Sequence, residues 1–299
     1  MVRAPGTEGH GSQHSHVLLN MRLAVLLLVL ATLPAAGQSV KETLIRSAKG
    51  LPQAKTEAAR DSLSTSIAQA LSAILGATDG LTVPMDDVPL SRVEPPDASF
   101  RLVTWNIPRD DGSQRYEGLL AVPKGRGVSV VRLKDMTPGI AAPEAVELGA
   151  ERWYGALYYA VVPVKKGGRT YYTLLGWKGY NKAETRKVIE VLSFRNGKPR
   201  FGAPLFGTTR PRTFRKVYGY SFQATMVLRW EPEMEAILMD HLSPSRPDMV
   251  GQPAYYGPDM THDAYFWYKG QWWLEPDIDA RDRRPNARSY KPPPKAPRP

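Results

Sequence analysis

From residue 99 onwards the hydrophobic pattern of the sequence has a period of two, and this limits the fold more than any other feature. Short segments rich in β-branched and aromatic residues alternate with turn signals such as Gly167-Gly168 and Asn196-Gly197. Such alternation is typical of a half-buried β-strand, and Asn-Gly is a strong hairpin signal. The predicted strands cover residues 99–107, 115–122, 128–133, 157–164, 170–177, 186–194, 214–220, 225–231, 235–241, 265–268 and 271–274.

One earlier segment has a helical pattern instead. Leu63, Ile67, Leu71 and Leu75 recur at steps of four, with Ala70 and Ile74 between them. This spacing predicts one amphipathic helix within residues 53–77. Residues 81–98 contain four prolines and are therefore expected to form an irregular linker.

These patterns predict a mainly β fold: an antiparallel sandwich or a curved meander sheet with one N-terminal amphipathic helix, with an α+β fold as the alternative. We expect a leader and signal peptide over residues 1–37, the helix and Pro-rich linker over 38–98, a β-rich domain over 99–280 and a tail over 281–299. A long loop or short helix over residues 134–152 is expected to divide the sheet region.

The N-terminal region carries an export signal. Residues 23–33 are apolar without interruption, follow Arg22, and precede small residues at Ala35 and Gly37. This order of charge, apolar core and cleavage site is that of a secretory signal peptide. Its core is shorter than the roughly 20 apolar residues that span a bilayer. We expect translation to begin at Met21, and a periplasmic or secreted product with no membrane-spanning segment after cleavage.

Cysteine usage and charge narrow the class of protein. The chain has no cysteine, so it has no disulfide and no lipid-attachment site, which favours bacterial export. The formal net charge is +11, but residues 281–299 hold seven Lys or Arg and one Asp, with six prolines. We expect this tail to be disordered, either as a solvated extension or as a segment that binds an anionic surface. The rest is nearly balanced, so we expect no nucleic-acid partner.

Several stretches, taken together, resemble a family of exported proteins of Bacteroidetes-type bacteria. They are FRLVTWNI (residues 100–107), WYGALYY (153–159), YYTLLGW (171–177), KVIEVL (187–192), DHL (240–242) and YGPD (256–259). The resemblance covers about residues 63–279 and supports export. It implies no activity, substrate or catalytic residue.

Aromatic and polar residues of the strands and loops are the candidate ligand-binding groups. Adjacent aromatics in a strand point to opposite faces, so we expect one ring of each pair in the core and the other on the surface. A row of exposed rings suits stacking on sugars, while rings that only cover a sheet face are the alternative. The candidate residues are Trp177, Tyr180, Asn181, Tyr256, Asp259, Trp267 and Trp272.

Few residues suit catalysis or metal binding. His241 and His262 are the only histidines after the leader, and no zinc-binding spacing is present, so we expect no metal and no cofactor. Ser221 follows Gly219-Tyr220 as in a nucleophile elbow, but the final glycine is missing. Three alternative roles remain open for one acidic group: its residues cap turns, coordinate calcium, or supply a general acid and a general base. The group consists of Asp259, Asp263, Glu275, Asp277, Asp279 and Asp282.

The sequence therefore favours a non-catalytic exported protein that binds a glycan or another envelope component. A carboxylate-based envelope or glycan hydrolase is the alternative. No pattern indicates an oligomeric state.

The signal peptide leads to the first prediction. N-terminal sequencing of the exported protein should give a mature chain that begins at Gln38, because the small residues at positions 35 and 37 fit signal peptidase. A mature chain that begins before Met21, or a product retained in the membrane, would contradict it.

Overall fold

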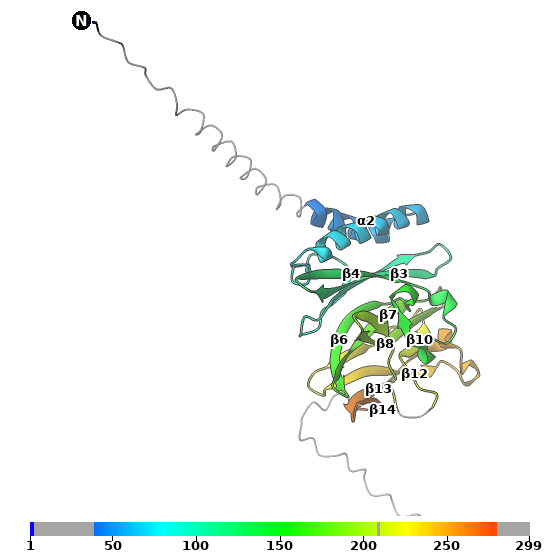
Figure 1. Ribbon diagram of the computed structural model, residues 1–299. Helices are drawn as coiled ribbons and strands as arrows, with labels where there is room; N and C mark the ends of the chain where they lie inside the picture. Colours follow the sequence, from blue (N-terminus) through cyan, green and yellow to red (C-terminus); the bar gives the residue numbers. More distant parts are fainter. Residues whose placement is uncertain (3–38, 208–209, 280–299) are drawn as a thin grey trace, which may run out of the picture.

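The fold is mainly β, as predicted. The computed structural model describes residues 1–2, 39–207 and 210–279 (Figure 1). It has 46% strand and 21% helix, and the sheets are antiparallel. The cleavage site expected after Gly37 and the basic tail lie outside the described residues. No helix among the described residues combines the length and apolarity needed to cross a membrane.

The strands form three sheets. The first has the order β1-β2-β3-β4, the second β5-β9-β8-β7-β6 with β10 also paired to β8, and the third β11-β12-β13-β14. Their bounds are β1 Ser91–Val93, β2 Arg101–Pro108, β3 Gln114–Lys124, β4 Gly127–Lys134, β5 Leu148–Gly149, β6 Leu157–Lys166, β7 Arg169–Gly179, β8 Glu184–Arg195, β9 Lys198–Phe201, β10 Lys216–Ser221, β11 Leu228–Glu231, β12 Ala236–Pro244, β13 Tyr256–Tyr268 and β14 Gln271–Glu275. Every predicted strand overlaps one of these, whereas β1, β5 and β9 were not predicted.

The predicted helix is α2 (Glu57–Gly76), and residues 39–50 form a further helix that was not predicted. The Thr56 side chain accepts a hydrogen bond from the backbone N–H of Ala59 at 3.2 Å, which caps α2. Short 3₁₀ turns occur at Leu51–Gln53, Thr137–Gly139, Pro143–Ala145, Ala150–Arg152, Pro247–Met249 and Pro253–Tyr255.

Helices and sheets stack as layers (Figure 1). The helices cover one face of the first sheet, where Leu71 packs with Val103. Leu102, which directly precedes Val103 on β2, packs with Leu174 between the first and second sheets. Leu175 packs with Ile237 between the second and third sheets. Because successive strand residues point to opposite faces, β2 and β7 fill a core on each side.

The segment predicted as an irregular linker contains a strand. Ser91–Val93 forms β1 and pairs with β2 at the edge of the first sheet. Met85 and Val88 of the same segment are buried against the helices. The four prolines lie outside β1, so they remove no N–H group from its ladder.

A buried lysine pins the segment that joins the first and second sheets. Lys178 on β7 is 1% exposed, and its Nζ donates to the Gly155 carbonyl at 2.5 Å and to the Thr137 hydroxyl at 2.9 Å. The Tyr116 and Tyr154 rings lie 4.3 and 4.6 Å from this amine. Burial lowers the pKa of Lys178 to about 7, while the charge of Asp135 raises it.

A buried ion pair connects the same segment to β8. The Arg215 Nε lies 2.7 Å from the Glu190 Oε2, and both side chains are fully buried. The guanidinium also donates to the carbonyls of Pro143, Val146 and Phe201. One arginine thus ties the 3₁₀ turn Pro143–Ala145 to strands β8 and β9 of the second sheet.

Removing the carboxylate of this pair should destabilise the protein strongly. Glu190→Gln leaves the buried Arg215 charge without a carboxylate to neutralise it, and such a loss typically costs about 3–5 kcal/mol. The control is Arg132→Ala, which removes an exposed arginine from its pair with Glu117; Glu117 keeps its contact with Arg115, so the loss should be about 1 kcal/mol or less. Denaturant unfolding measures both, and equal losses would contradict the structural role of the buried pair.

Candidate binding pocket

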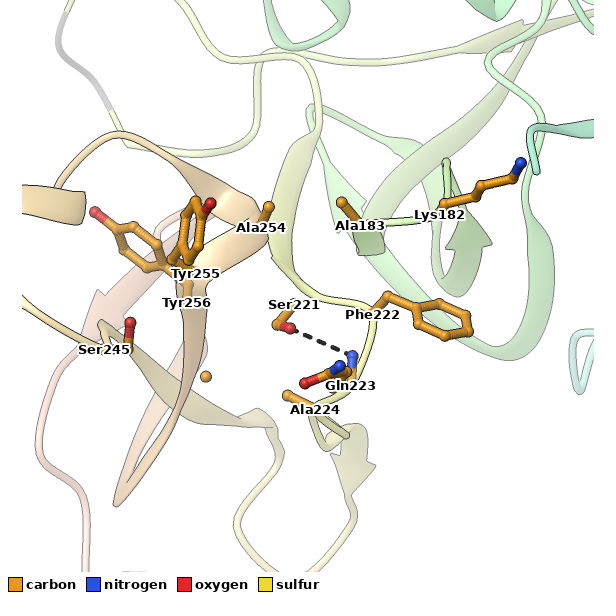
Figure 2. Close-up of a pocket in the computed structure, with 11 residues that line it drawn as sticks. Lys182, Ala183, Ser221, Phe222, Gln223, Ala224, Ser245, Ala254, Tyr255 and Tyr256 are labelled. Atoms are coloured by element: carbon orange, nitrogen blue, oxygen red, sulfur yellow. Dashed lines mark hydrogen bonds between the residues drawn. The ribbon is translucent and has the colours of Figure 1, made fainter. Parts of the chain in front are cut away.

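Three loops that lie at the same end of the strands line a cavity of about 610 Å³ (Figure 2). They are the β7–β8 loop, the β10–β11 loop and the β12–β13 connection. Lys182, Ser221, Gln223, Ser245, Tyr255 and Tyr256 line the cavity. Its volume lies within the range of about 300–1,000 Å³ that is usual for small-molecule sites.

The 3₁₀ turn Pro253–Tyr255 and the start of β13 form the tyrosine wall of this pocket. The turn packs closely on Gly219 of β10, where a Cβ atom would lie 2.7 Å from the Pro253 Cβ. The Tyr255 carbonyl accepts a hydrogen bond from the Ser245 N–H at 2.9 Å. The Tyr256 hydroxyl accepts one from the Gly251 N–H at 3.0 Å. Hydrogen bonds therefore hold the main chain at Tyr255 and the hydroxyl of Tyr256.

The facing wall follows the end of β10. The Phe222 N–H donates to the Ala183 carbonyl at 2.9 Å, which joins the β10–β11 loop to the β7–β8 loop. The Ser221 hydroxyl accepts a hydrogen bond from the Gln223 N–H at 3.3 Å, shown as a dashed line in Figure 2. In that view the two tyrosines lie together on one side of Ser221 and Gln223, and Phe222 lies on the other.

The lining combines aromatic rings with neutral hydrogen-bonding groups. Phe222 and Tyr255 are 62% and 48% exposed, which is unusual for rings of this size. Hydroxyls and an amide come from Ser221, Ser245 and Gln223. Lys182 is the one charged side chain in the described lining, which contains neither a carboxylate nor a histidine. Such a surface can stack on an apolar face and bind hydroxyls, but it offers no acid–base pair.

Three of the predicted site residues belong to this region. Tyr256 lines the pocket, and Tyr180 and Asn181 lie in the adjoining β7–β8 loop. The Asn181 Oδ1 accepts hydrogen bonds from the N–H groups of Ala183 and Glu184, both at 2.8 Å, so it shapes the loop. The Arg186 guanidinium stacks on the Tyr180 ring, with its Cζ 3.4 Å from the ring centroid.

The predicted tryptophans pack toward the core. Trp272 is 1% exposed, and its indole N–H donates to the Thr173 hydroxyl at 3.0 Å. Trp267 is half-buried and contacts Trp272 with 5.2 Å between ring centroids. Trp177 is also half-buried. The expectation of an exposed Trp272 is therefore corrected.

The packing of the sheets decides which ring of an adjacent pair faces outward. Adjacent rings do point to opposite faces: Trp273 is 40% exposed where Trp272 is buried, and Tyr159 is 41% exposed where Tyr158 is buried. The third sheet turns the face with Trp272 toward the second sheet, so Trp273 is left outside. Tyr268, on the same hairpin, is 58% exposed.

The described members of the acidic group, Asp259, Asp263, Glu275, Asp277 and Asp279, are not among the residues that line the pocket, and Asp282 lies outside the described residues. His241 Nδ1 lies 2.9 Å from Asp263 Oδ2, and His241 Nε2 lies 4.0 Å from Asp259 Oδ2. The hydrogen bond with Asp263 raises the pKa of His241. Hydrogen bonds from Ser243 and Thr261 lower the pKa of Asp259 to about 2, the opposite of what a general acid needs. No group of three or more potential ligands in the described residues could hold a metal ion.

Phe222, Gln223 and Ser245 were not predicted from the sequence as binding residues. Ser221 was considered only as a nucleophile, and the structure places that serine beside neutral groups instead. An available signal was Phe222 itself, a large apolar residue between Ser221 and Gln223 in a predicted connection. An exposed ring in a polar turn has no core to fill.

Comparison with protein-family models, curated proteins and solved structures finds no match for this chain.

Proposed function

We propose that this protein is a non-catalytic, exported glycan-binding module and that the three-loop pocket holds the sugar. The observation that carries the proposal is the lining itself: exposed rings beside neutral donors and acceptors, with no carboxylate among the described lining residues. The signal peptide expected from the sequence supports a ligand in the cell envelope.

The pocket offers complementary contacts to a sugar ring. A pyranose has an apolar face of C–H groups and a rim of hydroxyls. The exposed Tyr255 ring suits the face, and Ser221, Gln223 and Ser245 suit the rim. The backbone hydrogen bonds at Tyr255 and Tyr256 hold the wall in place before binding, which lowers the entropy cost of binding. Because carboxylates are absent from the described lining, a neutral glycan fits better than a cationic one.

Removing the stacking ring should weaken binding. Tyr255→Ala should reduce affinity for a neutral oligosaccharide about fivefold, since stacking on one aromatic ring contributes on the order of 1 kcal/mol. Neutral glycans on an array identify the probe, and calorimetry measures it. The matched control is Tyr268→Ala, which removes a similarly exposed ring on the β13–β14 hairpin. Equal losses in both variants, or no neutral glycan bound, would sink the proposal.

A second prediction separates binding from hydrolysis. The double variant His241→Ala with His262→Ala should bind the same glycan as the wild type, because neither histidine lines the pocket. Neither protein should release reducing ends. If the wild type hydrolyses the glycan and the variant loses the ~100-fold typical of a missing general base, the hydrolase alternative replaces this account.

A further inference from the structure

The hairpin turns at the other end of the stack lie together. The Tyr172 hydroxyl, near the β6–β7 turn, donates to the Asp97 carboxylate at 2.9 Å. The Phe100 ring at the start of β2 contacts Tyr172 and Phe194, at 5.0 and 6.0 Å between centroids. These contacts bring the β6–β7 and β8–β9 turns beside the β3–β4 turn, because β2 begins opposite the end of β3. The β7–β8 loop of the pocket lies at the opposite end of β7.

These turns carry a concentration of cations. Lys124 and Arg126 lie on the β3–β4 turn, and the second sheet and the β13–β14 turn add more. The basic turn end, as we name it, consists of the exposed side chains of Lys124, Arg126, Lys165, Arg169, Lys198 and Lys269. The Lys166 side chain is adjacent to Gly270, so the β6–β7 and β13–β14 turns are neighbours.

The anionic groups near the basic turn end do not neutralise it. Glu147 already pairs with Arg195 at 3.0 Å and faces Arg200 at 3.9 Å. Asp97 accepts hydrogen bonds from Ser99 and Tyr172. Exposed Glu233 and Glu235 lie on the β11–β12 turn, at the same end of the third sheet as Lys269, but the six cations outnumber them. Among the described residues, the six cations of the basic turn end have no carboxylate within ion-pair distance.

Two further cations, Lys166 and Arg212, lie close together, and Lys166 is beside the basic turn end. Burial lowers the pKa of Lys166, and the positive charge of Arg212 lowers it further. Like charges gathered at one end destabilise the free protein and attract an anionic partner. The clustered positive charge therefore favours a negatively charged partner.

We propose that the basic turn end binds the surface of a lipid bilayer through the phosphates of anionic headgroups. The cations sit on separate turns spread over three stacked sheets, which suits a broad planar partner more than one small anion. Each Lys or Arg close to an anionic bilayer strengthens binding about fivefold. Binding at this end leaves the three-loop pocket, at the other end of the stack, facing away from the membrane.

Vesicle sedimentation with the full mature chain tests the proposal. The protein should bind vesicles of phosphatidylcholine with about 30% phosphatidylglycerol, release in high salt, and not bind phosphatidylcholine alone. The triple variant Lys124→Glu, Lys165→Glu and Lys198→Glu should bind at least about tenfold more weakly.

The matched control is Lys49→Glu, Lys55→Glu and Arg246→Glu, which changes the net charge equally at exposed sites away from the basic turn end. It should bind nearly as well as the wild type. Equal losses in both variants, or unchanged binding in both, would overturn the proposal. Binding of soluble heparin without binding of anionic vesicles would replace the membrane with a polymer. Thermal melts check folding, and Lys165→Gln with Lys198→Gln repeats the test if the triple variant is unstable.

Discussion

The second sheet is the element on which the rest of the structure depends, because it is buried on both faces. Alternating residues of β8 divide between two cores: Val188 and Leu192 face the first sheet, and Ile189 and Val191 face the third. Glu190 lies among them, fully buried, and its pairing with Arg215 makes that burial tolerable. Lys178 anchors the connection to the first sheet in the same way.

This layered arrangement gives the molecule two ends of different chemistry. Since the strands are antiparallel, tight hairpins gather at one end and the longer connections at the other. The hairpins carry the six cations of the basic turn end, and the longer connections line the pocket. The packed sheets form a rigid scaffold, and the loops carry the exposed polar, charged and aromatic side chains.

The strand pattern was predictable because alternation is a local property of the sequence. Elements such as β5, with two residues, and β9, with four, give too short a signal, and their pairing comes from the tertiary fold. The choice between Trp272 and Trp273 could not be read from the sequence, because it depends on which face of the third sheet meets the second. The pocket combines Lys182, Ser221 and Tyr255, which are distant in the chain, so no spacing reveals it.

The central claim is that the three-loop pocket is where the protein binds its ligand, and amide chemical-shift mapping tests it most directly. Titration with a neutral oligosaccharide that binds the protein should shift the amide signals of Ala183, Gln223 and Gly257, which line the pocket. The signals of the β13–β14 hairpin and of His241 should stay in place. Shifts confined to Tyr268 and Trp273, or to His241 and Asp263, would place the ligand elsewhere and contradict the account.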